Sequence, residues 1–198
     1  MRKRAEDRRL EIVEAVLRLA VEMGPDRLTT QAVADAVGVS QPAVFRHFPT
    51  RAALWLAVAH HVSGRMRACW DAAASPTDDP IADVRRLAVA QMGVVADEPS
   101  ILAIVFSHEL RVADPALAAV FRGLMGDISG RLAARFAAAG DRLLASPPDA
   151  ALLVLGLLQG LALRWSLAGR GFDLVSEGER LLDLQLAGLA RPGAGVTP

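Results

Sequence analysis

Apolar residues recur at intervals of three and four along almost the whole chain, and this spacing constrains the fold more than any other feature. Ile12, Val16 and Leu19 begin one such stripe, which ends at Gly24-Pro25 as a helix does. No segment shows a convincing alternation of apolar and polar residues, which a half-buried strand needs. The pattern predicts an all-α protein of about nine helices.

Composition limits the class of protein further. The chain has 198 residues, of which 53% are hydrophobic, and a chain of this size and apolarity can bury a sizeable core. Cys69 is its one cysteine, so no intramolecular disulfide can form. The longest apolar stretch, residues 150–158, is too short to span a bilayer, and the N-terminal segment lacks the apolar core of a signal peptide. We expect a soluble, cytoplasmic protein with no membrane partner.

The charge is balanced overall but not along the chain. Residues 1–70 hold 11 Lys and Arg against 7 Asp and Glu, whereas residues 71–198 hold 11 against 15. A basic N-terminal part indicates an anionic partner such as nucleic acid. A solvated charged face explains this modest asymmetry about as well.

Two short helices are predicted after the first one. Thr29 and Thr30 can cap a helix that closes at Gly38, and Ser40 can cap the next, with Pro42 in its first turn. Two short helices joined by a Gly-containing turn and packed on a longer helix have the outline of a helix-turn-helix. Once Val33, Val44 and Phe48 face inward, the outward side chains are Gln41, Pro42, Arg46 and His47. Such side chains suit base edges and phosphates in the major groove.

The segment LTTQAVADAVGVSQPAVFRHFPTRAAL, residues 28–54, resembles the DNA-binding region of tetracycline-repressor-like (TetR/AcrR family) transcriptional regulators. Their pattern runs roughly T-T-x-x-I-A-x-x-A-G-V-S-x-x-x-x-Y-x-H-F-x-x-K-x-x-L. The matching positions are Thr29, Thr30, Ala34, Gly38, Val39, Ser40, His47, Phe48 and Leu54. The resemblance implies a homodimer with an N-terminal DNA-binding domain, here residues 1–53, and a ligand-binding and dimerisation domain, here residues 54–198.

In such proteins the third helix reads the major groove, and the starts of the second and fourth helices touch phosphate. The DNA-binding residues that the motif and this resemblance imply are Thr30, Gln31, Ser40, Gln41, Pro42, Phe45, Arg46, His47 and Arg51. Phe45 replaces the family's usual Tyr and cannot donate a hydroxyl to phosphate, which favours packing at that position. Each site residue has a plainer alternative: His47 could pack at its helix end, and Arg51 could simply face solvent.

Residues 150–168 are apolar on nearly every side, so such a helix must be covered all round. If one face packs on its own chain, the other needs a partner, and the last helix is its natural neighbour. Two helices from each subunit would form a four-helix dimer interface, where Gly156 and Gly160 allow close approach. The predicted interface residues are Leu152, Leu155, Gln159, Leu163, Leu182, Leu186 and Leu189. The alternative is a helix fully buried in a monomeric core.

A dimer of this kind would place two recognition helices on double-stranded DNA with a near-palindromic operator. Large apolar or amphipathic side chains in the remaining helices could line a pocket for a small apolar or weakly polar effector. The candidate ligand-binding residues are Met66, Trp70, Met92, Phe106, His108, Phe121, Met125 and Trp165. Ordinary core packing is the alternative for each of them.

Other classes of function find less support in the sequence. It contains no H-E-x-x-H, no G-x-S-x-G, no phosphate-binding loop and no cysteine pair, so we expect neither an enzyme nor a bound metal or cofactor. His60 and His61 are adjacent and would point about 100° apart on a helix, which does not suit one metal ion. A helical adaptor that binds only protein, with a vestigial DNA-binding head, is the alternative to a ligand-responsive repressor.

Overall fold

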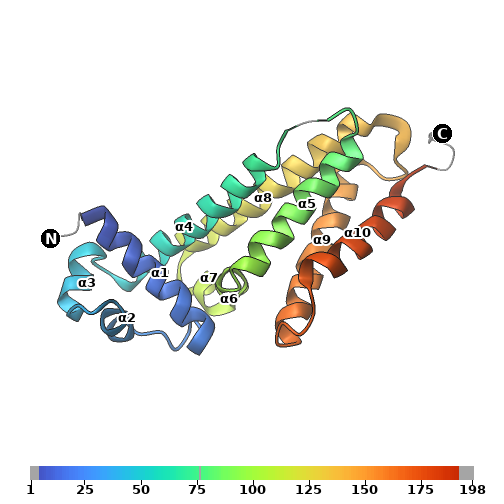
Figure 1. Ribbon diagram of the computed structural model, residues 1–198. Helices are drawn as coiled ribbons and strands as arrows, with labels where there is room; N and C mark the ends of the chain where they lie inside the picture. The colour runs from blue at the N-terminus through green and yellow to red at the C-terminus, as the bar shows by residue number, and fades with distance from the viewer. Residues whose placement is uncertain (1–4, 76, 192–198) are drawn as a thin grey trace. The chain divides into compact units, whose positions relative to one another are not determined.

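The computed structural model describes residues 5–75 and 77–191, with the backbone alone at 109, 111 and 113. These residues form ten α-helices and one 3₁₀-helix, and the part of the chain so described contains no strand (Figure 1). A single bridge joins Leu143 to Ala190. The predicted all-α architecture is therefore confirmed.

The helices group into two compact units. The head unit comprises Met1–Arg65 and Glu98–Gly123, and the body unit comprises Met66–Asp97 and Leu124–Pro198. Helix α4, Arg51–Ala72, contributes residues to both units, and the domain division at residue 53 stays a prediction.

In the head unit, α1 (Ala5–Met23), α2 (Thr30–Val37) and α3 (Gln41–His47) share one small core. The Thr29 hydroxyl accepts a hydrogen bond from the Ala32 amide at 3.1 Å and caps α2. Gly38 ends that helix with φ of 71°, a left-handed conformation that favours glycine. Val33, Val44 and Phe48 are buried, as the apolar pattern predicts. The turn and the core together fix the angle between α2 and α3.

Helices far along the chain complete the head unit. α6 (Ser100–Val105) packs against α1, and α7 (His108–Ala113) follows it. The Ser107 hydroxyl donates to Asp26 at 3.4 Å, and Arg65 forms an ion pair with Glu98. These contacts explain why residues 98–123 join the head unit instead of the body unit.

The body unit is built from α5 (Pro80–Asp97), the end of α4, most of α8 (Pro115–Ala139), α9 (Pro147–Leu167) and α10 (Leu174–Leu189). Helix α10 packs against both α5 and α9. Its Gly178 makes this possible, because a β-carbon there would lie 1.9 Å from the Met92 sulfur. Trp70, Phe136 and Leu182 are fully buried.

Side-chain caps set two further helix bounds. α6 and α7 are separate helices, because the Ser107 hydroxyl accepts from the Leu110 amide and caps a new helix. The last helix starts at Leu174, since the Asp173 carboxylate is its N-cap and accepts from the Ser176 amide at 2.9 Å.

The sequence analysis expected no apolar stretch long enough to span a bilayer, and helix α9 differs from that expectation. By length and composition its 21 residues could cross a bilayer. Gln159 and Arg164 interrupt the apolar run, but the mean hydropathy of the helix stays high enough for a membrane span. Val154, Leu158 and Leu161 are buried in the body unit, as in the core helix of a soluble protein, which passes the same test.

Candidate nucleic-acid interface

Helix α3 turns an apolar side inward and a mixed polar side outward. Val44 is completely buried, whereas Pro42, Phe45 and Arg46 are exposed and Gln41 is half-buried. Pro42 lies in the first turn of the helix, where its missing amide hydrogen costs nothing. Within the described residues, the Arg46 guanidinium makes no hydrogen bond or ion pair. The outer side of α3 is thus available to a ligand.

The start of α3 is also open. Ser40 occupies the N-cap position, yet its exposed hydroxyl makes no capping hydrogen bond. At the other end of the helix, His47 is half-buried and its backbone carbonyl is already bonded to Arg9. A helix start of this kind presents free amide and hydroxyl donors, which commonly bond phosphate oxygens.

The flanking residues of the predicted interface lie on α2 and α4 of the same head unit. Thr30 is half-buried, and the exposed Gln31 donates its side-chain amide to Asp35 at 2.7 Å. Arg51 is exposed, and its only hydrogen bond to the described residues is a long one, 3.4 Å to the Pro25 carbonyl. Such a contact is easily exchanged for a phosphate. All nine predicted residues therefore belong to one compact unit.

Arg9 is a further residue of this region that the motif does not indicate. Its guanidinium donates to the His47 carbonyl and lies 4.3 Å above the centre of the Phe48 ring. A cation at a helix C-terminus interacts favourably with the last carbonyl groups. Arg9 therefore fixes the end of α3 against α1. In the sequence it is one charged residue on the polar side of a helix, and nothing distinguishes it from its neighbours.

Comparison with known proteins agrees with this geometry. Residues 12–58 match the family model described as "Bacterial regulatory proteins, tetR family". The N-terminal region of the chain is therefore similar to tetR-family domains. The match covers α2, α3, most of α1 and the first turns of α4, so it includes every predicted DNA-binding residue.

The chain is also similar to individual proteins and solved structures. The nucleoid occlusion factor SlmA of Marinomonas sp. (strain MWYL1) is 38% identical over 55 residues, and the match spans only 28% of either chain. A transcriptional regulator from Rhodococcus sp. Rha1 superposes with a TM-score of 0.78 at 21% identity, covering 91% of this chain and 95% of that one. FadR from Bacillus subtilis, solved with stearoyl-CoA, gives 0.75 at 13% identity, covering 91% and 98%. At these identities the structural likeness concerns the fold.

The predicted dimer residues separate into two groups. Leu155, Leu182, Leu186 and Leu189 are buried among side chains of their own body unit. Leu152 and Leu163 are exposed, and Gln159 is half-buried with its amide 3.2 Å from the Met125 sulfur. Three further leucines on α9 and α10 are also exposed, Leu153, Leu167 and Leu184, so the interface residues stay a prediction. A helix that is apolar on all sides does not reveal which side its own chain covers.

The candidate ligand residues are divided between the units. Phe106, His108 and Phe121 belong to the head unit, and Met66, Trp70, Met92, Met125 and Trp165 belong to the body unit. Phe106 and His108 are exposed, Met125 is half-buried, and the other five are buried.

The two buried indole groups in this set already have partners. The Trp70 nitrogen donates to the Gln91 side chain at 2.6 Å, and the Trp165 nitrogen donates to the Phe172 carbonyl at 2.9 Å. These bonds and the contact of Met92 with α10 account for three members of the set as core residues. A pocket lined by the set stays a prediction.

Proposed function

We propose that the protein is a dimeric, sequence-specific DNA-binding transcriptional regulator of the cytoplasm, and that it represses genes until a small apolar ligand releases it. The observation that carries this proposal is the outer side of α3 in a tetR-family domain. There, Gln41, Pro42 and Arg46 lie beside one another. The described helix has no acidic side chain, and Arg46 has no hydrogen-bond or ion-pair partner in it.

Each exposed group of this surface has a distinct role on DNA. The Gln41 amide can pair with the edge of an adenine, and the Pro42 ring can lie against a thymine methyl group. Arg46 and Arg51 can neutralise phosphates, which supplies affinity without reading sequence. Arg9 holds the C-terminal end of α3, so the helix enters the groove at a fixed angle. Base contacts and backbone contacts therefore come from different residues and can be separated by mutation.

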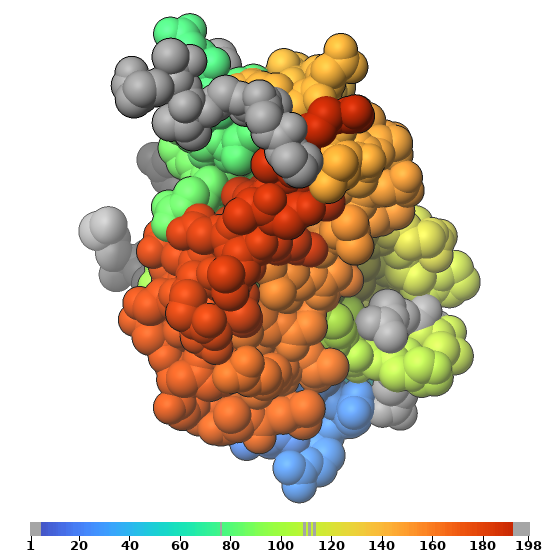
Figure 2. Space-filling model, turned by 90° about the vertical axis from the view of Figure 1, so that its right-hand side faces the viewer, coloured from blue at the N-terminus to red at the C-terminus, as the bar shows by residue number. Residues whose placement is uncertain are grey.

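The dimer is proposed to form through the exposed side of α9 and α10, which lie next to each other across the face shown in Figure 2. Leu152 and Leu163 on α9 and Leu184 on α10 are exposed. Gly156 and Gly160 are exposed too, and a β-carbon at either would meet no described atom within 4 Å beyond the backbone of the helix itself. Exposed leucines beside glycines are suited to close packing against a second copy of the same helices.

Repression and release rest on less direct support. A dimer bound to an operator that overlaps a promoter excludes polymerase without needing any further surface. FadR, which shares the fold, was solved with stearoyl-CoA, a ligand with a long apolar chain. The predicted ligand residues of this protein are also largely apolar. We propose an apolar effector that changes the separation of the two recognition helices and so weakens operator binding.

Selection of bound fragments from a library of the source genome tests the proposal. The best fragment is then titrated at several salt concentrations with the purified full-length protein. We expect enrichment of a near-palindrome with half-sites about 34 Å apart or a multiple of it, two subunits per site, and a steep salt dependence. No enrichment at any low salt concentration, with a dimer still present, would favour the protein-binding adaptor instead.

A further inference from the structure

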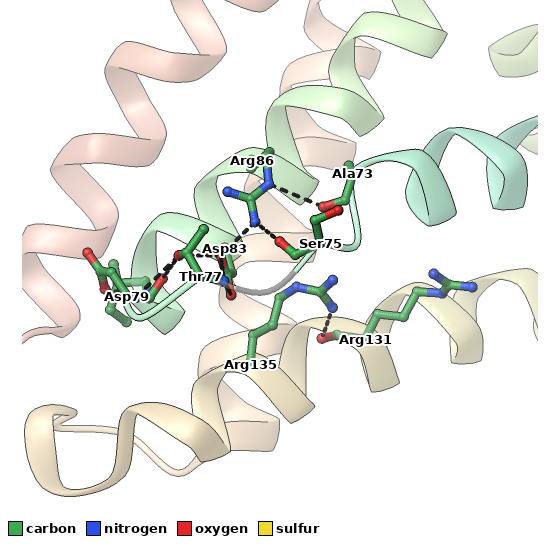
Figure 3. A network of polar contacts seen from close by, with 9 residues as sticks. Ala73, Ser75, Thr77, Asp79, Asp83, Arg86, Arg131 and Arg135 are labelled. Carbon is green, nitrogen blue, oxygen red and sulfur yellow. Dashed lines mark hydrogen bonds and ion pairs between the residues drawn. The ribbon is translucent and has the colours of Figure 1, made fainter.

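Three arginines lie close together in the body unit (Figure 3). Arg86 is on α5, and Arg131 and Arg135 are one turn apart on α8. Figure 3 shows the Arg135 guanidinium between the other two, facing the segment that joins α4 to α5. Three like charges in a partly buried place need compensation.

Asp83 is the buried carboxylate of this cluster, and Thr77 and Arg86 already bond it. It accepts hydrogen bonds from the amide of Thr77 at 3.0 Å, from the Thr77 hydroxyl at 2.8 Å and from Arg86 at 2.6 Å. These bonds, above all that from the Thr77 amide, lower the pKa of Asp83. Arg86 also bonds the carbonyls of Ala73 and Ser75. Asp83 makes neither a hydrogen bond nor an ion pair with Arg135, the third arginine.

Arg135 lacks a carboxylate partner among the described residues. Its one hydrogen bond runs from Nη1 to the Arg131 carbonyl of its own helix, 2.9 Å away. A guanidinium has five N–H donors, so most of its donors are open. Burial, followed by repulsion from Arg131 and Arg86, lowers the pKa of Arg135 despite the opposing attraction of Asp83. The half-buried charge is thus incompletely compensated by the protein itself.

Arg131, one turn earlier, is fixed on one side only. It lies 5.7 Å from the centre of the buried Trp70 ring, which holds its guanidinium plane. Its ion-pair partner, Asp71 at 2.6 Å, is 64% exposed. An exposed carboxylate contributes little to such a pair and can be displaced by a better anion. Arg131 and Arg135 together therefore present unused donors on one side of α8.

We propose that Arg131 and Arg135 form a binding site for the phosphate or carboxylate group of a small molecule. Guanidinium groups bind both kinds of oxyanion through paired, charge-assisted hydrogen bonds. A phosphate has more acceptor oxygens than a carboxylate and can bond both arginines at once, so we expect it to bind more tightly. The site lies in the body unit and does not depend on the DNA-binding assignment.

Calorimetric titration and thermal unfolding of the full-length protein test this site, with inorganic phosphate and acetate as probes up to about 10 mM. Ionic strength is held constant with chloride at near-neutral pH, so that screening does not change. We expect saturable phosphate binding, weaker acetate binding, and a rise in melting temperature with ligand concentration. Acetate binding more tightly than phosphate would instead assign a carboxylate ligand to the same pair of arginines.

Arg135→Met keeps the length and apolar stem of the side chain but removes the donors. It should weaken phosphate binding about tenfold or more, since charge-assisted hydrogen bonds are lost. In chloride alone its melting temperature should be unchanged or higher, because an uncompensated half-buried charge has been removed. Arg131→Met should also weaken binding. Arg122→Met is the matched control, because Arg122 is exposed on the same helix and lies outside the cluster.

A purely structural role for Arg135 makes the opposite prediction: Arg135→Met would lower the melting temperature equally with and without phosphate. That result would overturn the proposal, as would equal phosphate binding by the wild-type and Arg135→Met proteins, or none by the wild type. Operator binding of Arg135→Met without phosphate is measured in parallel. A variant that loses phosphate but binds operator normally separates this site from the proposed DNA-binding function.

Discussion

Replacing Leu152 by Asp should dissociate the proposed dimer, and the structure gives the size of the effect. Leu152 is 58% exposed on α9, and full burial of a leucine side chain contributes about 1.5 to 3 kcal/mol. Covering the exposed part in a dimer is therefore worth about 1 to 2 kcal/mol per protomer. A symmetric interface contains the residue twice, so the loss is about 2 to 4 kcal/mol. The dimer dissociation constant should rise by about 30-fold to several hundred-fold, and burial of the new charge adds to this.

Sedimentation velocity over a range of protein concentrations measures that change directly. Leu184→Asp, on the exposed side of α10, should act in the same direction. Leu10→Asp is the matched control, since Leu10 is 44% exposed on α1 of the head unit and should leave the dimer intact. If Leu152→Asp and the wild type dissociate at the same concentration, or if Leu10→Asp is the variant that dissociates, the α9–α10 interface is refuted.

Four further substitutions test the head and the body. Gln41→Ala should cost roughly 1 to 3 kcal/mol of discrimination between operator bases, whereas Arg51→Ala should weaken all sequences alike and reduce the salt slope by about one; competition binding at several salt concentrations distinguishes them. Gly38→Ala should destabilise by about 1 to 2 kcal/mol in chemical denaturation, through backbone strain alone, since its φ is 71° and its β-carbon would meet no described atom. The folded-state pKa of Asp83 is lowered, so its contribution to folding stability is present above the unfolded pKa and is lost as pH falls through the folded pKa. Asp83→Asn should flatten that acid dependence of stability.

Local rules were sufficient for most helix boundaries. The Thr29 and Gly38 caps enclose α2 as predicted, and Asp114 accepts from the Ala116 amide at the start of α8. The break at Ser107 is not visible in the local pattern, because a serine within an apolar run gives no signal unless its hydroxyl accepts from an amide, here that of Leu110. A Pro or Gly beside a cap favours particular backbone conformations and can be recognised in the sequence. A serine cap depends instead on which of two competing hydrogen bonds its hydroxyl makes.

The candidate sites divide in a similar way. The DNA-binding residues follow from a short segment with fixed spacing, so the sequence places them together before any tertiary contact is known. Arg9 and Arg135 could not be found in this manner. Arg9 bonds the carbonyl of residue 47, and Arg135 lies near two other arginines, one of them on another helix. Their significance arises from packing between helices, which no local pattern contains.

Gly156 and Gly160 connect the sequence prediction to the proposed dimer. A glycine inside a helix costs about 1 kcal/mol relative to alanine, and α9 contains both in its interior. Gly178 on α10 has a clear compensation within the chain, since a side chain there would collide with Met92. Gly156 and Gly160 have none within the described residues of their own chain, for they are exposed and open. If a partner helix packs against them, replacing both with alanine should stabilise the isolated subunit by up to about 2 kcal/mol while weakening the dimer. An increase in both subunit stability and dimer affinity would mean that no helix approaches them.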